Sequence, residues 1–255
     1  MWGHQEKPIL ISFKIIKDLK RKQKMLILIM ISINLPPKKT NKEIENFFKK
    51  KKVNLFVNES KGKQLSVNEM IVDVPYIPRL NDLYRLYQFI VLNKRTTILE
   101  FGSGWSSLIL YLALSDLKKK YSKQVKNLRR NNPFELFIVE NEKKYLNISK
   151  NRIIKFSKTL KLKQTPKIHY CFSDVEMTLF NNKIATQYKK LPLCNPDFVY
   201  LDGPDLFNVK RDINGISLRH KDMLPMVCDI LKFEYFYTPG TIIVCDGRAA
   251  NAKFL

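Results

Sequence analysis

The chain has 255 residues, of which 45% are hydrophobic and 27% charged, so it can bury the core of one large domain or of a domain with an extension. Its 46 Lys and Arg against 23 Asp and Glu give a formal net charge of +23, which favours anionic partners such as nucleic acid or a lipid surface. The excess is mostly Lys spread along the chain, and an arginine-rich arm, a zinc-finger spacing and an RNA-binding aromatic signature are absent. Nucleic acid is therefore not the favoured partner.

The cysteines and the N-terminal apolar run bear on location. The four cysteines form no C-x-x-C pair and are typical of reduced structural thiols, which favours a cytoplasmic protein. The apolar run at residues 25–33 is too short for a spanning helix, which needs about 20 apolar residues. The run also does not follow the layout of a secretory signal. We expect a buried strand or short helix and no transmembrane segment, with a peripheral contact to anionic lipid as the alternative.

Residues 1–77 form a basic N-terminal extension with few regular patterns. Thr40 and Glu43 make a capping-box pattern ahead of Ile44, which predicts a helix whose end carries the Lys run 49–52 as a solvated surface. Two short extended pieces are predicted at residues 53–57 and 70–74.

From residue 78 onward, strands and helices alternate. Helical periodicity covers residues 80–91, the stretch that begins at Trp105, residues 145–156 and residues 223–231, while apolar runs predict strands at 96–101, 136–140, 167–172, 197–202 and 241–246. Continuous apolar strands that alternate with helices indicate a parallel sheet covered on both faces, which is a doubly wound α/β fold in residues 78–255.

Acidic residues follow these strands at their carboxyl ends, where such sheets bind ligands. They are Glu100, Glu140, Asp202 and Asp246, with Asp174 two places beyond the third strand. Turns and helix starts also favour Asp and Glu, which would explain any one of them. Five such residues at one rim favour a polar site.

The segment "LEFGSGWS" turns from the first strand into a helix through Gly102 and Gly104. Two glycines there allow a tight turn and a close approach of a ligand to the backbone. A nicotinamide-binding G-x-G-x-x-G motif would have glycine at position 107, which is Ser107 here, so an oxidoreductase is the weaker reading. The preceding Glu100 suits a ligand with a cationic amino-acid portion.

The ordered segments "LEFGSGWS", "FIVENE", "CFSD", "VYLDGP" and "IIVCDG" resemble the class I S-adenosylmethionine-dependent methyltransferases, over residues 78–255. The resemblance implies a Rossmann-like fold that binds S-adenosylmethionine. It implies that the methionine portion of this cofactor is lined by Glu100, Phe101, Gly102, Ser103, Gly104, Trp105 and Ser106.

The same resemblance assigns the rest of the cofactor site. Glu140, followed by Asn141, would accept both ribose hydroxyls, and Ser173 and Asp174 would border the adenine. Asp202 would face the methyl group, as a cofactor contact and as the catalytic base or hydrogen-bond acceptor.

The chain departs from the family in three places. Glu140 follows Gly104 by 36 positions (140 − 104) rather than about 20, and the Lys-rich segment 116–132 accounts for the excess as an extended helix end and loop. Ser106 replaces a frequent small glycine. The chain also stops at Leu255, where the family adds two more strands, so we expect a five-stranded sheet whose exposed edge implies a truncated chain, an oligomer or a covering partner.

The polar segment 203–219 is predicted to lie over the carboxyl ends of the sheet as a substrate lid. Its Lys210, Arg211 and Arg219 would hold an anionic acceptor, and His220 is a candidate base or a helix-capping residue. The sequence favours methyl transfer, preferably to oxygen, on a small or glycan-like acceptor. The alternatives are a non-catalytic protein of the same fold that binds nucleic acid or an anionic surface, and a nicotinamide-dependent oxidoreductase.

Asp202 and Asp246 also form a candidate Mg²⁺ site. Metal-dependent O-methyltransferases of this fold place carboxylates at the same two strand ends, and an ion there would lower the pKa of an acceptor hydroxyl. The family's adjacent Asn is replaced by Gly247, and the nearest amide is Asn251. In the competing account Asp202 acts alone and Asp246 caps the following turn.

Overall fold

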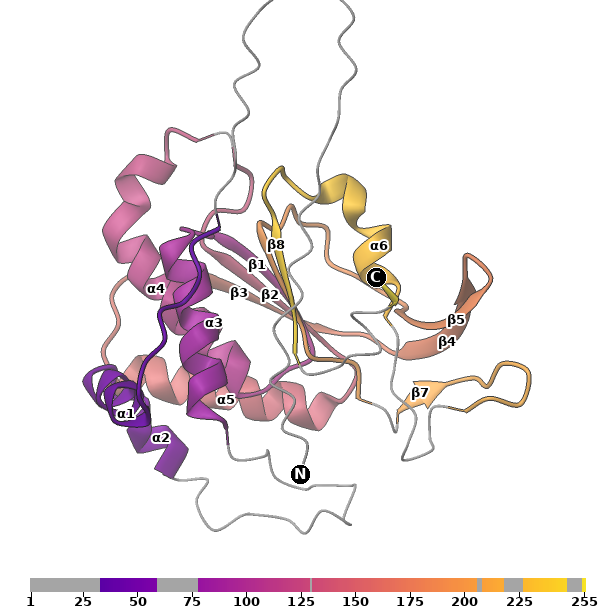
Figure 1. Cartoon of the computed structure of the whole chain (residues 1–255), viewed down its shortest axis with the longest axis horizontal. Coiled ribbons are helices and arrows are strands. Elements are labelled where there is room, and N and C mark those ends of the chain that lie inside the picture. Colours follow the sequence, from indigo (N-terminus) through magenta and orange to yellow (C-terminus); the bar gives the residue numbers. More distant parts are fainter. Residues whose placement is uncertain (1–32, 59–77, 129, 206–207, 218–226, 247–253) are drawn as a thin grey trace, which may run out of the picture.

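The computed structural model describes residues 33–58, 78–128, 130–205, 208–217, 227–246 and 254–255. Its centre is a five-stranded, all-parallel sheet in the order β3-β2-β1-β6-β8 (Figure 1). The strands are β1 (Thr97–Phe101), β2 (Glu135–Glu140), β3 (Lys167–Phe172), β6 (Phe198–Leu201) and β8 (Ile242–Cys245). All five predicted strands and the parallel α/β class are confirmed, and the architecture is compatible with a Rossmann-like fold.

Three helices cover one face of this sheet: α3 (Leu80–Leu92), α4 (Trp105–Val125) and α5 (Lys143–Thr159). Strand side chains alternate between the two faces, so Ile98 and Ile138 pack with these helices while Leu99 and Val139 pack on the opposite face. The long α4 and the loop after it account for the extra residues between the glycine turn and β2, as the sequence predicts.

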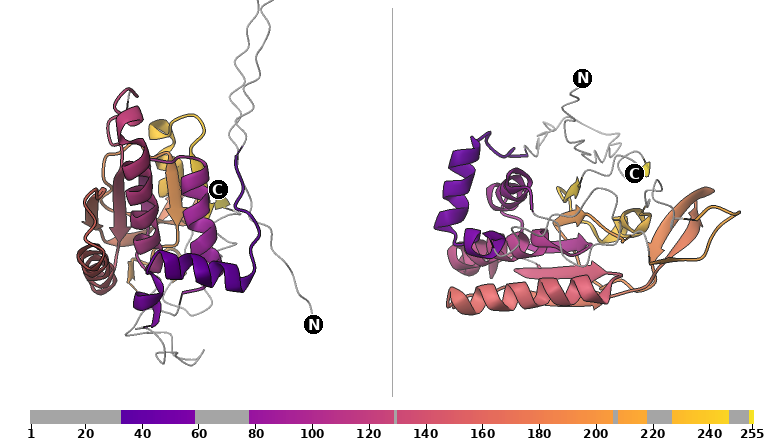
Figure 2. Two further views of the ribbon diagram at one scale, coloured as in Figure 1. Left: turned by 90° about the vertical axis from the view of Figure 1, so that its left-hand side faces the viewer. Right: turned by 90° about the horizontal axis from the view of Figure 1, so that it is seen from below.

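The second sheet was not predicted from the sequence. It contains β4 (Val175–Phe180), β5 (Lys183–Tyr188) and β7 (Val209–Lys210). Asn181 and Asn182 connect β4 to β5 with φ values of 48° and 60°, the left-handed conformation that two-residue hairpin turns require and that Asn tolerates. The segment "LFNNKI" carries this signal. Figures 1 and 2 show the second sheet on the side of the molecule opposite α1 and α2.

The N-terminal helices are α1 (Asn41–Lys50) and α2 (Asn54–Asn58). The predicted capping box is confirmed: the Glu43 backbone N–H donates to Thr40 Oγ1 at 3.3 Å, and the Thr40 backbone N–H donates to Glu43 Oε2 at 2.9 Å. The extended piece predicted at 53–57 is wrong, because this stretch forms α2 and buries Val53 and Phe56 in the same core as α3. Residues 33–58 therefore share a hydrophobic core with the sheet domain.

The predicted helix 223–231 is confirmed only at its end. Residues 229–231 lie in the short helix α6 (Asp229–Lys232), which is followed by the 3₁₀ turn η1 (Glu234–Phe236), whereas Val227 forms a β-bridge with Thr186. The buried Asp229 carboxylate accepts the Tyr188 backbone N–H at 3.1 Å, which ties this segment to β5. The remaining residues of that prediction, the extended piece at 70–74 and residues 25–32 of the apolar run lie outside the described residues. Among the helices of the described part, none is long and apolar enough to cross a membrane.

Candidate functional site

Three carboxylates and one glycine follow neighbouring strands at the same level. Phe101 pairs in register with Val139 and Leu201, and Leu201 pairs with Cys245. The next residues along the four strands are Glu140, Gly102, Asp202 and Asp246, in that order across the sheet. Adjacent parallel strands lie about 4.8 Å apart, and equivalent positions face the same way. This acidic row, Glu140–Gly102–Asp202–Asp246, spans the topological switch point between β1 and β6, where open α/β sheets bind ligands.

The other two predicted acids lie outside this row, so the expectation of five carboxylates at one level is wrong. Glu100 lies one pleat below it, in register with Ile138 and Tyr200. Asp174 lies two residues beyond the end of β3, where the chain has already turned toward β4.

Glu100 is fully buried and is held by the helix that follows it. Ser106 Oγ donates to Glu100 Oε1 at 2.5 Å, and Ser107 Oγ donates to Glu100 Oε2 at 2.6 Å. Burial raises the pKa of Glu100 to about 8, against the two serine hydrogen bonds that lower it. In this arrangement Glu100 fixes the first turn of α4 to the end of β1 and exposes no surface to a ligand.

The two glycines of the turn have different reasons to be glycine. Gly102 has φ +93°, and a Cβ there would lie 2.7 Å from the Gly203 backbone nitrogen, so the fold itself requires glycine. Gly104 has an extended φ of −172°, and its nearest neighbour to an added Cβ would be Ser106 Oγ at 3.8 Å. The fold leaves room for a side chain at Gly104, so a close approach by a ligand is one physical reason for glycine there.

Phe101 and Trp105 flank this turn. The Phe101 side chain is completely buried on the face of the sheet opposite α4 and packs against Tyr188, with ring centroids 5.5 Å apart. Its side chain is therefore part of the core rather than of the ligand site. Trp105 begins α4, is 7% exposed, and leaves its indole N–H without a hydrogen-bond partner in the described structure.

Glu140 connects the ends of β1 and β2. Its Oε1 accepts the backbone N–H groups of Asn141 at 2.8 Å and Glu142 at 2.9 Å, and its Oε2 accepts Ser103 Oγ at 2.8 Å. Burial raises the pKa of Glu140 to about 7, although these three hydrogen bonds lower it. The carboxylate is therefore oriented toward the glycine turn and titrates near neutral pH.

The described part of the predicted lid does contact the end of β2. Asn141 and Asp205 exchange two hydrogen bonds: the Asp205 backbone N–H donates to Asn141 Oδ1 at 2.8 Å, and Asn141 Nδ2 donates to the Asp205 carbonyl at 3.1 Å. Asn208 Nδ2 donates to Glu142 Oε2 at 2.6 Å. These contacts hold Asp205 and Asn208 against the turn that follows Glu140.

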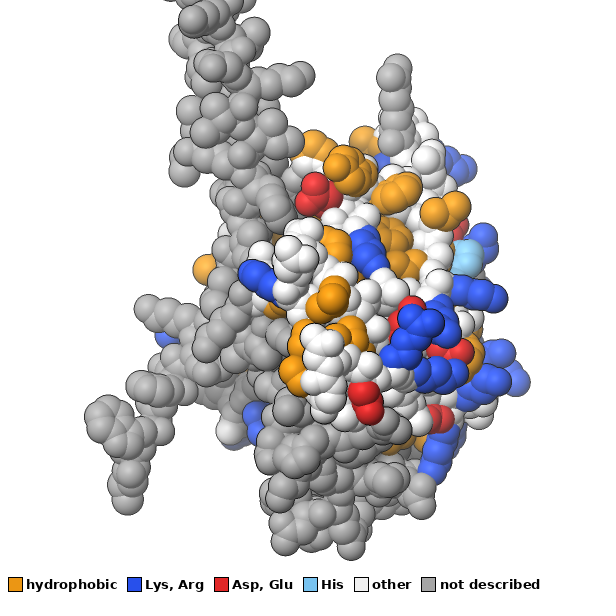
Figure 3. Space-filling model, turned by 90° about the vertical axis from the view of Figure 1, so that its right-hand side faces the viewer, with side chains coloured by type: hydrophobic (Ala, Val, Ile, Leu, Met, Phe, Trp, Pro, Cys, Tyr) orange, Lys and Arg blue, Asp and Glu red, His pale blue; other side chains and the backbone are white. Residues whose placement is uncertain are grey.

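Two of the basic residues assigned to an anionic acceptor already have acidic partners. Lys210 Nζ lies 2.9 Å from Asp174 Oδ1, and Arg211 Nε lies 3.4 Å from Glu176 Oε2. Figure 3 shows Lys and Arg side chains interleaved with Asp and Glu on this face of the molecule. These ion pairs join the lid segment to β4, and Arg219, the third cation, lies outside the described residues.

Ser173 is buried at the end of β3. Its Oγ donates to the Asp174 carbonyl at 3.1 Å and accepts the Lys190 backbone N–H at 2.8 Å. The hydroxyl therefore connects the end of β3 to Lys190, two residues beyond the end of β5. The adenine border at Ser173 and Asp174 stays a prediction.

Asp202 and Asp246 end neighbouring strands, and both act on the buried Tyr200. Burial first, then the charges of Asp202 and Asp246, raise the pKa of Tyr200 well above its ordinary value, and the Tyr200 side chain hydrogen-bonds to Asp246. Within the described residues, His, Cys, Asp and Glu side chains form no group of three or more that could hold a metal ion. Two carboxylates, one of them engaged by a tyrosine, are an incomplete Mg²⁺ donor set. His220 lies outside the described residues.

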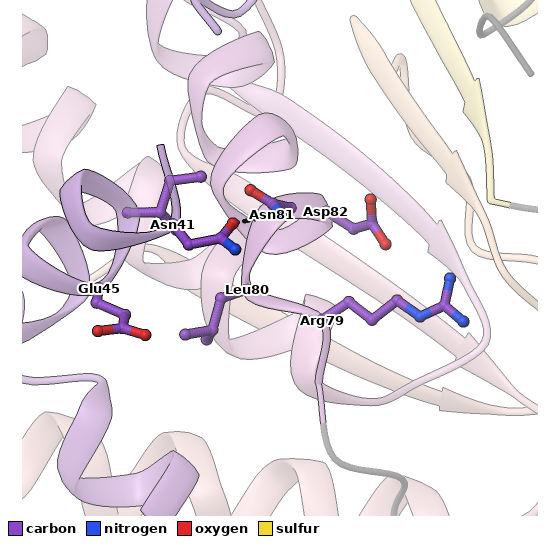
Figure 4. Close-up of a pocket in the computed structure, with 7 residues that line it drawn as sticks. Asn41, Glu45, Arg79, Leu80, Asn81 and Asp82 are labelled. Atoms are coloured by element: carbon purple, nitrogen blue, oxygen red, sulfur yellow. Dashed lines mark hydrogen bonds between the residues drawn. The ribbon is translucent and has the colours of Figure 1, made fainter. Parts of the chain in front are cut away.

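A pocket of about 470 Å³ lies between the first turns of α1 and α3 (Figure 4). It is lined by Asn41, Ile44, Glu45, Arg79, Leu80, Asn81 and Asp82. Asn81 Nδ2 donates to Asn41 Oδ1 at 3.2 Å. Because α3 leads directly into the parallel sheet and packs along it, its first turn lies at the end where the strands stop (Figure 1). This pocket has no signature in the sequence, because it forms between two helices that residues 51–79 separate.

Comparison with known proteins finds no family model that matches the chain and no curated protein whose sequence matches it significantly. The fold and the geometry of the strand ends therefore carry the functional argument.

Proposed function

We propose that the chain binds S-adenosylmethionine across the acidic row and transfers its methyl group to a small, hydroxyl-bearing acceptor. The observation that carries the proposal is the order Glu140–Gly102–Asp202 at the switch point. This order places one carboxylate on either side of Gly102, which has no side chain. This order matches the ligand. The ribose hydroxyls of a nucleoside would lie against the Glu140 carboxylate, and a sulfonium centre would lie near the Asp202 carboxylate.

Each part of the site would have a separate task. Glu140 would accept a ribose hydroxyl, the turn from Gly102 to Trp105 would hold the amino-acid end, and Asp202 would accept the proton or hydrogen bond of the acceptor hydroxyl. S-adenosylmethionine supplies the electrophilic methyl group.

A nicotinamide cofactor has less support. Ser107 stands where the third glycine of a dinucleotide motif would allow close packing, and its hydroxyl is used inside the fold by Glu100. The backbone N–H of Gly104 also donates to Ser107 Oγ at 3.2 Å, which engages one of the turn's amide groups.

Isothermal titration calorimetry with S-adenosylmethionine, S-adenosylhomocysteine and NADH tests the proposal. We expect binding of the two adenosyl compounds and none of NADH, and Glu140→Gln should weaken both adenosyl compounds. Tight binding of NADH with no heat from either adenosyl compound would contradict the assignment.

A further inference from the structure

Arg152 of α5 reaches across to the glycine turn at the start of α4. Its Nη1 donates to the Gly104 carbonyl at 2.9 Å, and its guanidinium lies 4.0 Å from the centre of the Trp105 ring. Ser149, one turn earlier on α5, donates to the same carbonyl at 3.4 Å. Gly104 is therefore fixed from both sides, because its backbone N–H is also bound by Ser107 Oγ.

The charge of Arg152 is unusual for its position. Burial lowers the pKa of Arg152 to about 10, and no carboxylate pairs with it among the described residues. The guanidinium also lies beside the start of the 21-residue helix α4, whose N-terminal end carries a partial positive charge. A cation at this end of a helix costs free energy in the empty protein, and that cost falls when a negative group binds nearby.

We propose that Arg152 is a positioning residue for the amino-acid end of the ligand. It acts through Gly104 and Trp105 and does not itself touch the ligand. With the Gly104 carbonyl held toward α5, the N–H of the same trans peptide, on Trp105, points the opposite way. The first N–H groups of a helix have no partner within it, so this orientation offers a donor to an α-carboxylate.

The inference rests on the proposed function, and adenosine separates the two. Adenosine contains the ribose and the base but lacks the amino-acid end, so it depends on Glu140 and does not use the Trp105 backbone N–H that Arg152 orients. We expect Arg152→Met to weaken the binding of S-adenosylhomocysteine by about tenfold, which corresponds to the loss of roughly one charge-assisted hydrogen bond. The binding of adenosine should change little. Arg152→Lys, which keeps the charge and one donor, should recover part of the loss.

The controls use the same helix and the neighbouring donor. Lys158→Met removes one exposed positive charge from α5 and should leave both affinities unchanged. Ser149→Ala removes the second donor to Gly104 and should weaken S-adenosylhomocysteine less than Arg152→Met does. If Arg152→Met fails to fold, the Ser149→Ala variant still tests whether holding the Gly104 carbonyl matters for binding. Trp105 fluorescence in a Trp2→Phe background should report S-adenosylhomocysteine directly, since the chain has two tryptophans.

The outcomes are distinct. A selective loss for S-adenosylhomocysteine, partial rescue by Lys and an unchanged Lys158→Met support the positioning role. Equal weakening of both ligands, or no weakening in Arg152→Met and Ser149→Ala, would overturn it while the proposed function stands. If the unaltered protein binds neither compound, the proposed function fails and this inference fails with it.

Discussion

Ser103 and Glu140 join the first two strand ends through a hydrogen bond of 2.8 Å between Ser103 Oγ and Glu140 Oε2. Two backbone N–H groups already occupy Oε1, so Oε2 retains the free acceptor capacity of this carboxylate. A ribose hydroxyl would therefore bind beside the Ser103 hydroxyl or displace it. The glycine turn and the proposed ribose acceptor are thus one connected unit.

In the proposed function, Glu140 is the determinant of ribose recognition. Glu140→Gln should weaken adenosine by about 1.5 to 3 kcal/mol, the usual loss for a hydrogen bond to a charged group. The variant should also lose most of the parent's preference for adenosine over 2′-deoxyadenosine, measured by calorimetry. A variant that kept the parent's preference would move the ribose contact to another residue.

The affinity for adenosine should depend on pH through the same residue. Because burial raises the pKa of Glu140 to about 7, the carboxylate is largely protonated below that pH and becomes the stronger acceptor above it. We expect adenosine to bind more tightly as pH rises from about 6 to 8, and Glu140→Gln to show no such rise. A parallel pH dependence in both proteins would assign the titration elsewhere.

The buried Glu100 should make stability depend on pH in the opposite sense. Its pKa is raised from 4.5 to about 8 by burial, so the folded state holds a proton that the unfolded state releases. Its contribution to stability is complete below about pH 4.5 and is lost as pH rises toward 8. Urea denaturation between these pH values should show a steeper loss of stability for the parent than for Glu100→Gln. Equal slopes would contradict this account.

The two glycines should separate folding from binding. Gly102→Ala should lower the free energy of unfolding by about 1 to 3 kcal/mol, because its φ is positive and its Cβ would collide with Gly203. Gly104→Val should melt close to the parent and lose affinity for S-adenosylhomocysteine, because its side chain would block the approach of the ligand to the backbone. Full affinity in a folded Gly104→Val protein would exclude the glycine turn as the ligand site.

Asp197 should stabilise the opposite end of the sheet. Its carboxylate accepts the backbone N–H groups of Thr96 at 3.0 Å and Thr97 at 2.9 Å, and it lies 3.2 Å from Arg130 Nη2. Asp197→Ala leaves these donors and the Arg130 charge buried, so we expect a loss of about 3 to 5 kcal/mol in chemical denaturation. Glu234→Ala, at an exposed acid, should change stability little. A loss below about 1 kcal/mol for Asp197→Ala, which is the usual contribution of an exposed ion pair, would show that water replaces these contacts.

The sequence by itself determined the elements that depend on local patterns. Apolar runs predicted the five parallel strands, and Thr40 with Glu43 predicted the start of α1, because periodicity and capping involve residues close together in the chain. The hairpin turn at Asn181 and Asn182 is equally local, although the predicted strands do not include it. The composition of residues 53–57 predicts an extended structure, but burial of Val53 and Phe56 against distant helices favours α2.

Only the tertiary structure decided which acidic residues lie side by side at the strand ends. Strand register sets Glu140, Asp202 and Asp246 at one level and Glu100 one pleat below, and a shift of a single residue would reverse the direction of every side chain. The contact between Arg152 and Gly104 joins residues 48 positions apart. Such contacts depend on how α4 and α5 pack on the sheet. That packing is set by the combined burial of many side chains and leaves no local pattern in the sequence.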